Sequence, residues 1–77
     1  MTHWTDNREI HWRYLHAHVL VVAVVNPGRE WGAYVADVRG DNGHAECVDA
    51  IDRGAKLSRP VAEALWPELA RKLSYRT

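Results

Sequence analysis

The chain holds two closely spaced pairs of residues that could bind zinc. His16 and His18 would project from one face of a strand, and His44 and Cys47 would share one face of a helix. Three histidines and one cysteine make a tetrahedral zinc site when two such pairs meet. Nothing in the sequence brings these pairs together, and the motifs C-x-x-C and H-E-x-x-H are absent. We therefore expect neither a metal site nor a cofactor.

Cys47 is the single cysteine, and beside a histidine it could act as a nucleophile. Its neighbours at helical spacing are apolar, which favours a buried thiol that fills the core. Neither Ser58 nor Ser74 lies in a G-x-S-x-G motif, and no glycine-rich phosphate loop is present. We expect a protein that is not an enzyme.

Aromatic and basic side chains alternate near the start of the chain. The candidate partner-binding residues are Trp4, Arg8, Trp12, Arg13 and Tyr14. Such a set suits protein contacts, and it also suits the stacking of single-stranded nucleic acid. The chain has ten basic and ten acidic residues, whereas general nucleic-acid binders are usually basic. A third interpretation is that these aromatics only cover an apolar sheet face.

The elements that must position these residues follow from hydrophobic periodicity. Residues 1–14 predict an extended segment that runs into a strand over residues 15–25, where valines favour strand over helix. Asn26-Pro27-Gly28 predicts a type II turn with glycine in the left-handed conformation. Residues 31–39 would return as the next strand. The expected register pairs Val24 with Trp31, Leu20 with Val35 and His18 with Asp37, and it places Tyr34, Ala36 and Val38 on the face of Val19, Val21 and Ala23.

Residues 40–54 fit either a helix or a third strand. Asp41-Asn42-Gly43 is a hairpin signal, but the apolar residues after it recur at helical spacing, and we prefer the helix. Asp41 or Asn42 would cap its start, and Gly54 stands where a residue after a helix end belongs.

Residues 58–75 predict a second helical region. Ser58 would cap it, Pro60 fits its first turn, and Pro67 should break it after Trp66. Its apolar stripe would cover the Val19, Val21 and Tyr34 face of the sheet. That stripe consists of Val61, Ala62, Leu65, Trp66, Leu69 and Leu73.

These elements predict the α+β fold class, in a single domain over residues 1–77. The expected architecture is a small two-layer sandwich in which an antiparallel β-hairpin or three-stranded meander precedes C-terminal helices. One layer of helices would leave Val22, Val24 and Trp31 in an exposed apolar patch. The N-terminal segment, helices on both faces or a second copy could cover it. We expect a homodimer with these three residues at its interface, because a 77-residue chain without a disulfide is a marginal monomer.

The function that these patterns favour is that of a small non-catalytic binding protein acting through protein–protein contacts. An inhibitor or regulator of bacterial or phage origin is one such protein. The alternative is a nucleic-acid-binding module that uses a local basic and aromatic patch. The longest apolar run, residues 19–25, is too short for a membrane-spanning helix, and the first residues do not resemble a signal peptide. We therefore expect a cytoplasmic protein with no membrane partner.

Overall fold

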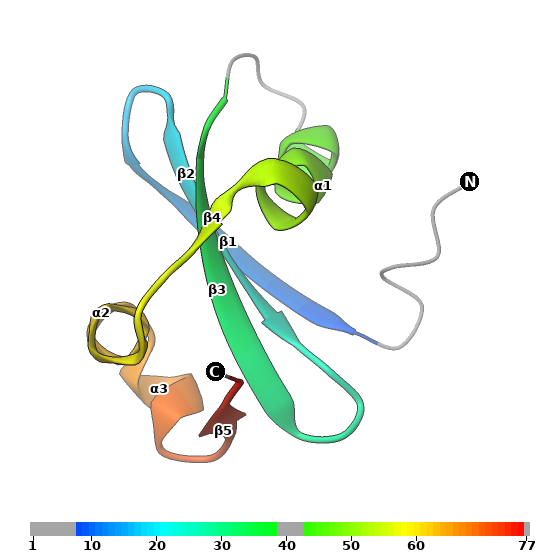
Figure 1. Ribbon diagram of the computed structural model, residues 1–77, viewed down its shortest axis with the longest axis vertical. Helices are drawn as coiled ribbons and strands as arrows, with labels where there is room; N and C mark the ends of the chain where they lie inside the picture. Colours follow the sequence, from blue (N-terminus) through cyan, green and yellow to red (C-terminus); the bar gives the residue numbers. More distant parts are fainter. Residues whose placement is uncertain (1–7, 39–42, 77) are drawn as a thin grey trace.

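An antiparallel meander forms the centre of the computed structural model, which describes residues 8–38 and 43–76. Strands β1 (Glu9–His16), β2 (Val19–Val25) and β3 (Glu30–Asp37) pair in sequence order (Figure 1). They are followed by α1 (Gly43–Arg53), β4 (Ala55–Lys56), α2 (Arg59–Leu65), α3 (Pro67–Ala70) and β5 (Ser74–Tyr75). The predicted α+β class, a meander followed by C-terminal helices, is confirmed.

Strands β1 and β2 replace the single strand expected over residues 15–25. A turn at Ala17-His18 separates them, and a bulge at Leu15 precedes that turn. Neither turn residue belongs to the types that mark turns in a sequence, so the apolar pattern continues across it. As a result β2 is a central strand, paired along both edges, which explains why its side chains are apolar on both faces.

The connection between β2 and β3 is one residue longer than the predicted type II turn. The backbone N–H of Asn26 donates to the carbonyl of Glu30 over 2.8 Å, and the N–H of Arg29 donates to the carbonyl of Asn26 over 3.0 Å. The left-handed residue is Arg29, with a φ of 67°, and not Gly28. This is the geometry of a three-residue hairpin loop.

The extra loop residue shifts the predicted register by one. Val25, rather than Val24, lies opposite Trp31. Side chains alternate along a strand, so this shift moves every β3 residue to the other face. Leu20 pairs with Ala36, and Val19 rather than His18 pairs with Asp37. Tyr34, Ala36 and Val38 consequently pack with Leu20, Val22 and Val24, while Trp31, Ala33 and Val35 pack with Val21 and Ala23.

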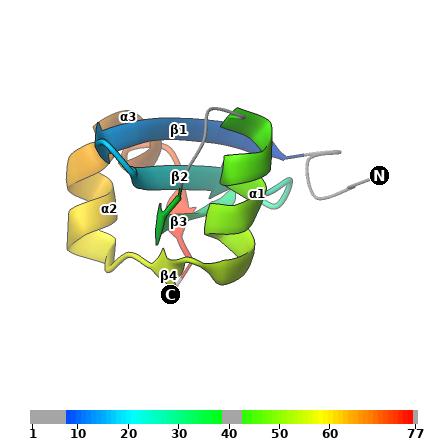
Figure 2. The same ribbon diagram turned by 90° about the horizontal axis from the view of Figure 1, so that it is seen from above.

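Helices cover both faces of this sheet (Figure 2). Helix α1 packs through Cys47 and Ala50 on the face that carries Leu20, Val22 and Val24. We call this face the α1 face. Helices α2 and α3 pack on the opposite face, and Trp66 there meets Trp31 edge-on with ring centroids 6.4 Å apart. Two separate apolar clusters therefore sandwich β2 and β3.

This two-sided cover removes the apolar patch on which a dimer interface was expected. Val22 and Trp31 are fully buried within one chain, and Val24 is 5% exposed. Of the three arrangements considered, the structure has helices on both faces. The three residues belong to the core, so the prediction that they meet a second copy is wrong.

Helix α1 confirms the helical interpretation of residues 40–54, although its predicted caps Asp41 and Asn42 lie outside the described residues. Gly54 follows the helix, and its N–H donates to the carbonyl of Ala50 over 2.9 Å. A Cβ at Gly54 would lie 2.4 Å from that oxygen and 2.6 Å from the carbonyl oxygen of Val35. Close backbone contact, and not a left-handed conformation, therefore requires glycine here.

The second helical region begins and breaks where the sequence predicts. Helix α2 follows Ser58 with Pro60 in its first turn, and Trp66 separates it from α3. The Ser58 side chain makes no capping hydrogen bond. Of the predicted apolar stripe, Ala62, Trp66 and Leu69 are buried, whereas Val61 is 48% exposed. The stripe covers Val21 as predicted, but the register shift replaces Tyr34 by Trp31.

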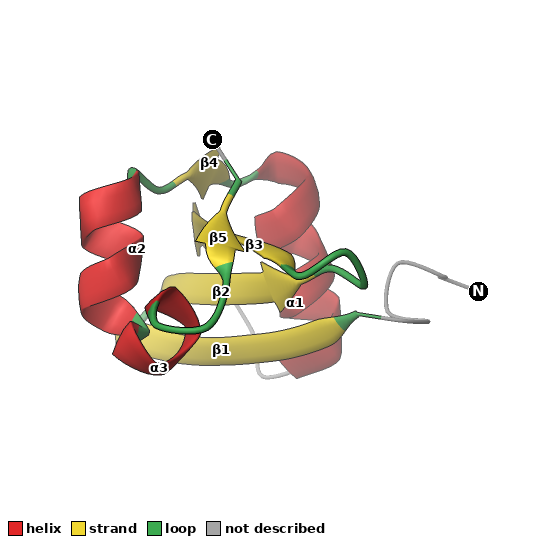
Figure 3. Ribbon diagram, turned by 90° about the horizontal axis from the view of Figure 1, so that it is seen from below, coloured by secondary structure: helices red, strands yellow, loops and turns green. Residues whose placement is uncertain are grey.

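The helical region does not extend to residue 75, because β5 returns to the sheet and pairs in parallel with β3 (Figure 3). Tyr75 then lies opposite Trp31. Its hydroxyl donates to the carbonyl of Leu57 over 2.7 Å and accepts from the N–H of Ala33 over 3.1 Å. One phenol therefore joins the C-terminal segment to β3 and to the chain after β4.

Candidate binding surface on strand β1

Strand β1 forms one edge of the sheet. It pairs with β2, and none of the other described strands pairs with it. Figure 3 shows it along the rim of the sheet, with α3 beside one end. The strand is eight residues long and contains neither proline nor lysine, but Glu9, Arg13 and the bulge at Leu15 are features that also protect sheet edges. The stretch before the bulge is therefore the part of its outer edge that can accept a further strand.

Three exposed apolar side chains gather on this edge strand. Trp12 is 48% exposed, Tyr14 37% and Leu15 47%. Trp12 and Tyr14 lie on the α1 face, opposite Val22 and Leu20, and their rings meet edge-on with centroids 5.9 Å apart. Among the described residues the other large apolar side chain with comparable exposure is Val61 on α2. Exposed apolar surface is thus concentrated on β1.

A hydrogen bond to α1 holds the Tyr14 ring. Its hydroxyl donates to Oε1 of Glu46, a residue that is only 5% exposed. The second carboxylate oxygen, Oε2, is buried and accepts no hydrogen bond from the part of the chain that the structure describes. The aromatic pair is therefore bordered by an acidic group. Sequence reasoning missed Glu46, because 32 residues separate it from Tyr14.

Arg13 does not belong to this aromatic surface. Strand alternation turns it to the opposite face, where its guanidinium lies 4.9 Å from the centroid of the Trp66 ring. Trp66 is 1% exposed, so the Arg13 side chain helps to cover a core residue. The predicted patch of interleaved aromatic and basic residues is consequently divided between two faces.

Of the two remaining predicted partner-binding residues, Arg8 does not join the aromatic pair. Arg8 immediately precedes β1 and lines a cleft together with Tyr34 and Arg76, two residues that sequence reasoning did not select. Trp4 lies outside the described residues. No local sequence pattern indicated Arg76, because it reaches the cleft only through the pairing of β5 with β3.

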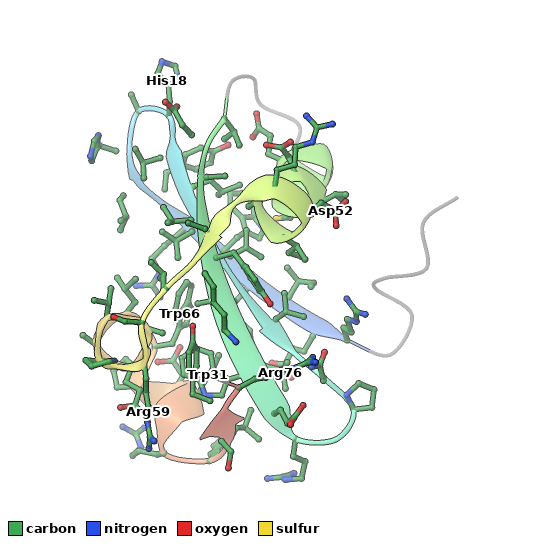
Figure 4. The ribbon with its side chains drawn as sticks, viewed as in Figure 1. His18, Trp31, Asp52, Arg59, Trp66 and Arg76 are labelled. Atoms are coloured by element: carbon green, nitrogen blue, oxygen red, sulfur yellow. The ribbon has the colours of Figure 1, made fainter. Side chains whose placement is uncertain are left out.

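The structure does not bring His16, His18 and Cys47 together as a metal site. His18 belongs to the β1–β2 turn rather than to a strand, and it points outward at the tip of the molecule (Figure 4), while His16 is an exposed residue at the end of β1. Cys47 lies on the side of α1 that packs on the sheet and is buried there. The His44 side chain is not among those described. Across residues 8–38 and 43–76, no group of three potential metal ligands occurs.

The environment of Cys47 disfavours a thiolate. Burial, and secondly the nearby Glu46 carboxylate, raise the pKa of its thiol to about 11. Nucleophilic and metal-binding cysteines have lowered pKa values, because the thiolate is the reactive form. Cys47 instead has the properties of a core residue.

No helix in the described part of the chain is long and apolar enough to cross a membrane. No protein-family model, curated protein or solved structure matches the chain. The surface geometry of β1 is therefore the basis for a functional proposal.

Proposed function

We propose that this chain is a small non-catalytic binding protein that acts through protein–protein contacts, with β1 as its contact surface. The observation that carries the proposal is the gathering of Trp12, Tyr14 and Leu15 on a sheet edge. Aromatic side chains are enriched at protein interfaces, where they bury a large area at a small cost in conformational entropy. Such a protein would act as an inhibitor or regulator by occupying its partner's surface.

The exposed edge suggests how the partner would bind. An extended segment of a partner protein can add to a free sheet edge, with backbone hydrogen bonds supplying affinity and side-chain contacts supplying specificity. On β1, Trp12 and Tyr14 would contact the added segment on the α1 face. The Tyr14–Glu46 hydrogen bond already restricts one of these rings, which lowers the entropy lost on binding.

The alternative partner, a single-stranded nucleic acid, has weaker support. Stacking proteins combine aromatic rings with cations that follow the phosphate backbone. Here the ring pair is bordered by Glu46, and Arg13 lies on the opposite face over Trp66. These two observations favour a protein partner over nucleic acid at this surface.

Site-specific photo-crosslinking in the cells that naturally make this protein tests the proposal. A benzophenone amino acid replaces Trp12, and a matched variant carries it at Val61, which is equally exposed at 48% but lies on α2. We expect one discrete protein adduct from position 12 and none from position 61. An additional Tyr14→Ala substitution should reduce the yield of that adduct.

Other outcomes would contradict the proposal. A nuclease-sensitive adduct at position 12 would favour the nucleic-acid alternative. An adduct of twice the chain's mass would show that β1 pairs with a second copy. Equal adducts from positions 12 and 61 would show that β1 is not a specific contact surface.

A further inference from the structure

A cleft opens on the α1 face of the sheet, where α1 leaves the end nearest the β2–β3 hairpin uncovered. Its volume is about 70 Å³. Val24 and Ile51 line it with apolar surface, and Tyr34, Arg8 and Arg76 supply polar groups. The cleft is independent of the exposed apolar side chains of β1.

Gly32 helps to open the cleft. It lies near the start of β3 opposite Val24, where a side chain would point to the α1 face. A Cβ at Gly32 would meet the Tyr34 hydroxyl at 3.5 Å and Cε of Lys56 at 3.7 Å, which are ordinary contacts. No left-handed conformation requires glycine here. The missing side chain instead leaves room beside the polar groups.

Backbone contacts position Arg76 at the cleft (Figure 4). Its N–H donates to the carbonyl of Trp31 over 2.7 Å, and its own carbonyl accepts a hydrogen bond from Nζ of Lys56. These bonds tie the residue to β3 and to β4. Arg8 reaches the same cleft from the other end of the chain, because the next residue, Glu9, pairs with Val25.

The charged side chains that line the cleft, among the residues that the structure describes, are those of Arg8 and Arg76. None of the described lining residues is acidic. The ion pairs found among the described residues involve Arg53, Arg59 and His11 instead. The side-chain amide of Asn26 and the hydroxyl of Tyr34 add neutral hydrogen-bond donors to the same lining. Planar guanidinium groups with free donors bind carboxylate or phosphate in a bidentate manner.

We propose that this cleft binds the phosphate monoester group of a small molecule. A phosphate monoester carries a charge of about −1.5 to −2 near pH 7, which balances two guanidinium groups, whereas a carboxylate balances one. With a volume of about 70 Å³ the cleft is small, so it would take the phosphate group itself, and the organic part of the molecule would extend out of it past Tyr34. The proposal does not depend on the partner that binds β1.

Amide-resolved NMR titrations at constant ionic strength test the proposal, with methyl phosphate as the probe and acetate as the carboxylate control. We expect saturable shifts centred on Gly32 and Arg76 with methyl phosphate. Arg8→Gln and Arg76→Gln should each weaken binding about tenfold, the effect of losing one charge-assisted contact. Arg71→Gln is the matched control, because Arg71 is exposed beyond α3 and does not line the cleft. The Arg71→Gln variant should bind methyl phosphate as tightly as the unaltered chain.

The spectra of the variants also show whether each remains folded, which is expected because Arg8 and Arg76 are exposed. Acetate that saturates the same amides at the same concentration would overturn the assignment to phosphate. Equal weakening by all three substitutions, or shifts that never saturate, would overturn the site itself. Inorganic phosphate binding more tightly than methyl phosphate would overturn the monoester assignment.

Discussion

Replacing Gly54 by alanine tests the closest backbone contact in the fold. The new Cβ would lie 2.4 Å from the carbonyl oxygen of Ala50 and 2.6 Å from that of Val35. Carbon–oxygen contacts normally begin near 3.3 Å, so each oxygen is about 0.7–0.9 Å too close. Both atoms belong to the backbone, and neither can move aside by a rotamer change. Relief requires the end of α1 to move away from β3.

We expect Gly54→Ala to lower the free energy of unfolding by about 3 kcal/mol or more, the upper part of the range for overpacking a core. A 77-residue domain has roughly 4–12 kcal/mol in total. The melting temperature should consequently fall by about 12 °C or more. Urea unfolding followed by the fluorescence of the buried residues Trp31 and Trp66 measures the first quantity, and circular dichroism measures the second.

Gly28→Ala is the matched control. No atom lies within 4 Å of a Cβ at this position, and Arg29 rather than Gly28 has the positive φ. Alanine should therefore stabilise the chain by about 0.4–1 kcal/mol, because it restricts the unfolded state. A loss of stability in Gly28→Ala would mean that the turn is of type II, with the register that the sequence predicts. If Gly54→Ala lowers the free energy of unfolding by less than about 1 kcal/mol, the close contact with Val35 is refuted.

Four further substitutions test the core and the β1 surface. Trp66→Ala should cost about 3–5 kcal/mol and lower the melting temperature by about 12 °C or more, because it empties a buried site. Val61→Ala on the exposed side of α2 should cost little, and equal melting temperatures for the two variants would refute the burial of Trp66. Tyr14→Phe should cost about 1–3 kcal/mol, because Glu46 loses its described donor, and an unchanged urea midpoint would contradict that bond. The fold raises the pKa of the Cys47 thiol from 9.0 to about 11, so this thiol loses its proton at a lower pH in the unfolded chain than in the folded chain. The free energy of unfolding should therefore fall by roughly 2–3 kcal/mol as the pH rises through that interval. Cys47→Ala should remove this part of the alkaline loss, and an identical pH profile in the variant would refute the shift.

The elements with strong local signals were predictable from the sequence. Valine enrichment identified β2, helical spacing identified α1, and Pro67 marked the break after Trp66. The β1–β2 turn was missed because Ala17-His18 lacks any residue that favours turns. The register was wrong because the left-handed position falls on Arg29, a residue type that rarely adopts it, so the sequence pointed to Gly28 instead.

The candidate sites depended on contacts that local patterns do not contain. Period-2 alternation already placed Trp12 and Tyr14 on one face and Arg13 on the other, but it did not indicate that Trp66 would lie beneath Arg13. Glu46 and Arg76 reach their sites through long-range packing and strand pairing. The two-sided apolar pattern of β2 was correctly read as demanding cover on both faces, but the sequence did not distinguish a second helix layer from a second copy.

The β5–β3 pairing has a consequence for how the chain acquires its structure during synthesis. Proteins leave the ribosome N-terminus first, so the meander emerges before the segment that completes its sheet. Trp31 lies against Tyr75, with ring centroids 4.8 Å apart, and its carbonyl accepts the N–H of Arg76. A nascent chain that ends before residue 74 therefore exposes one of the largest aromatic side chains of its core. The sheet around Trp31 is therefore completed only after translation has passed Arg76.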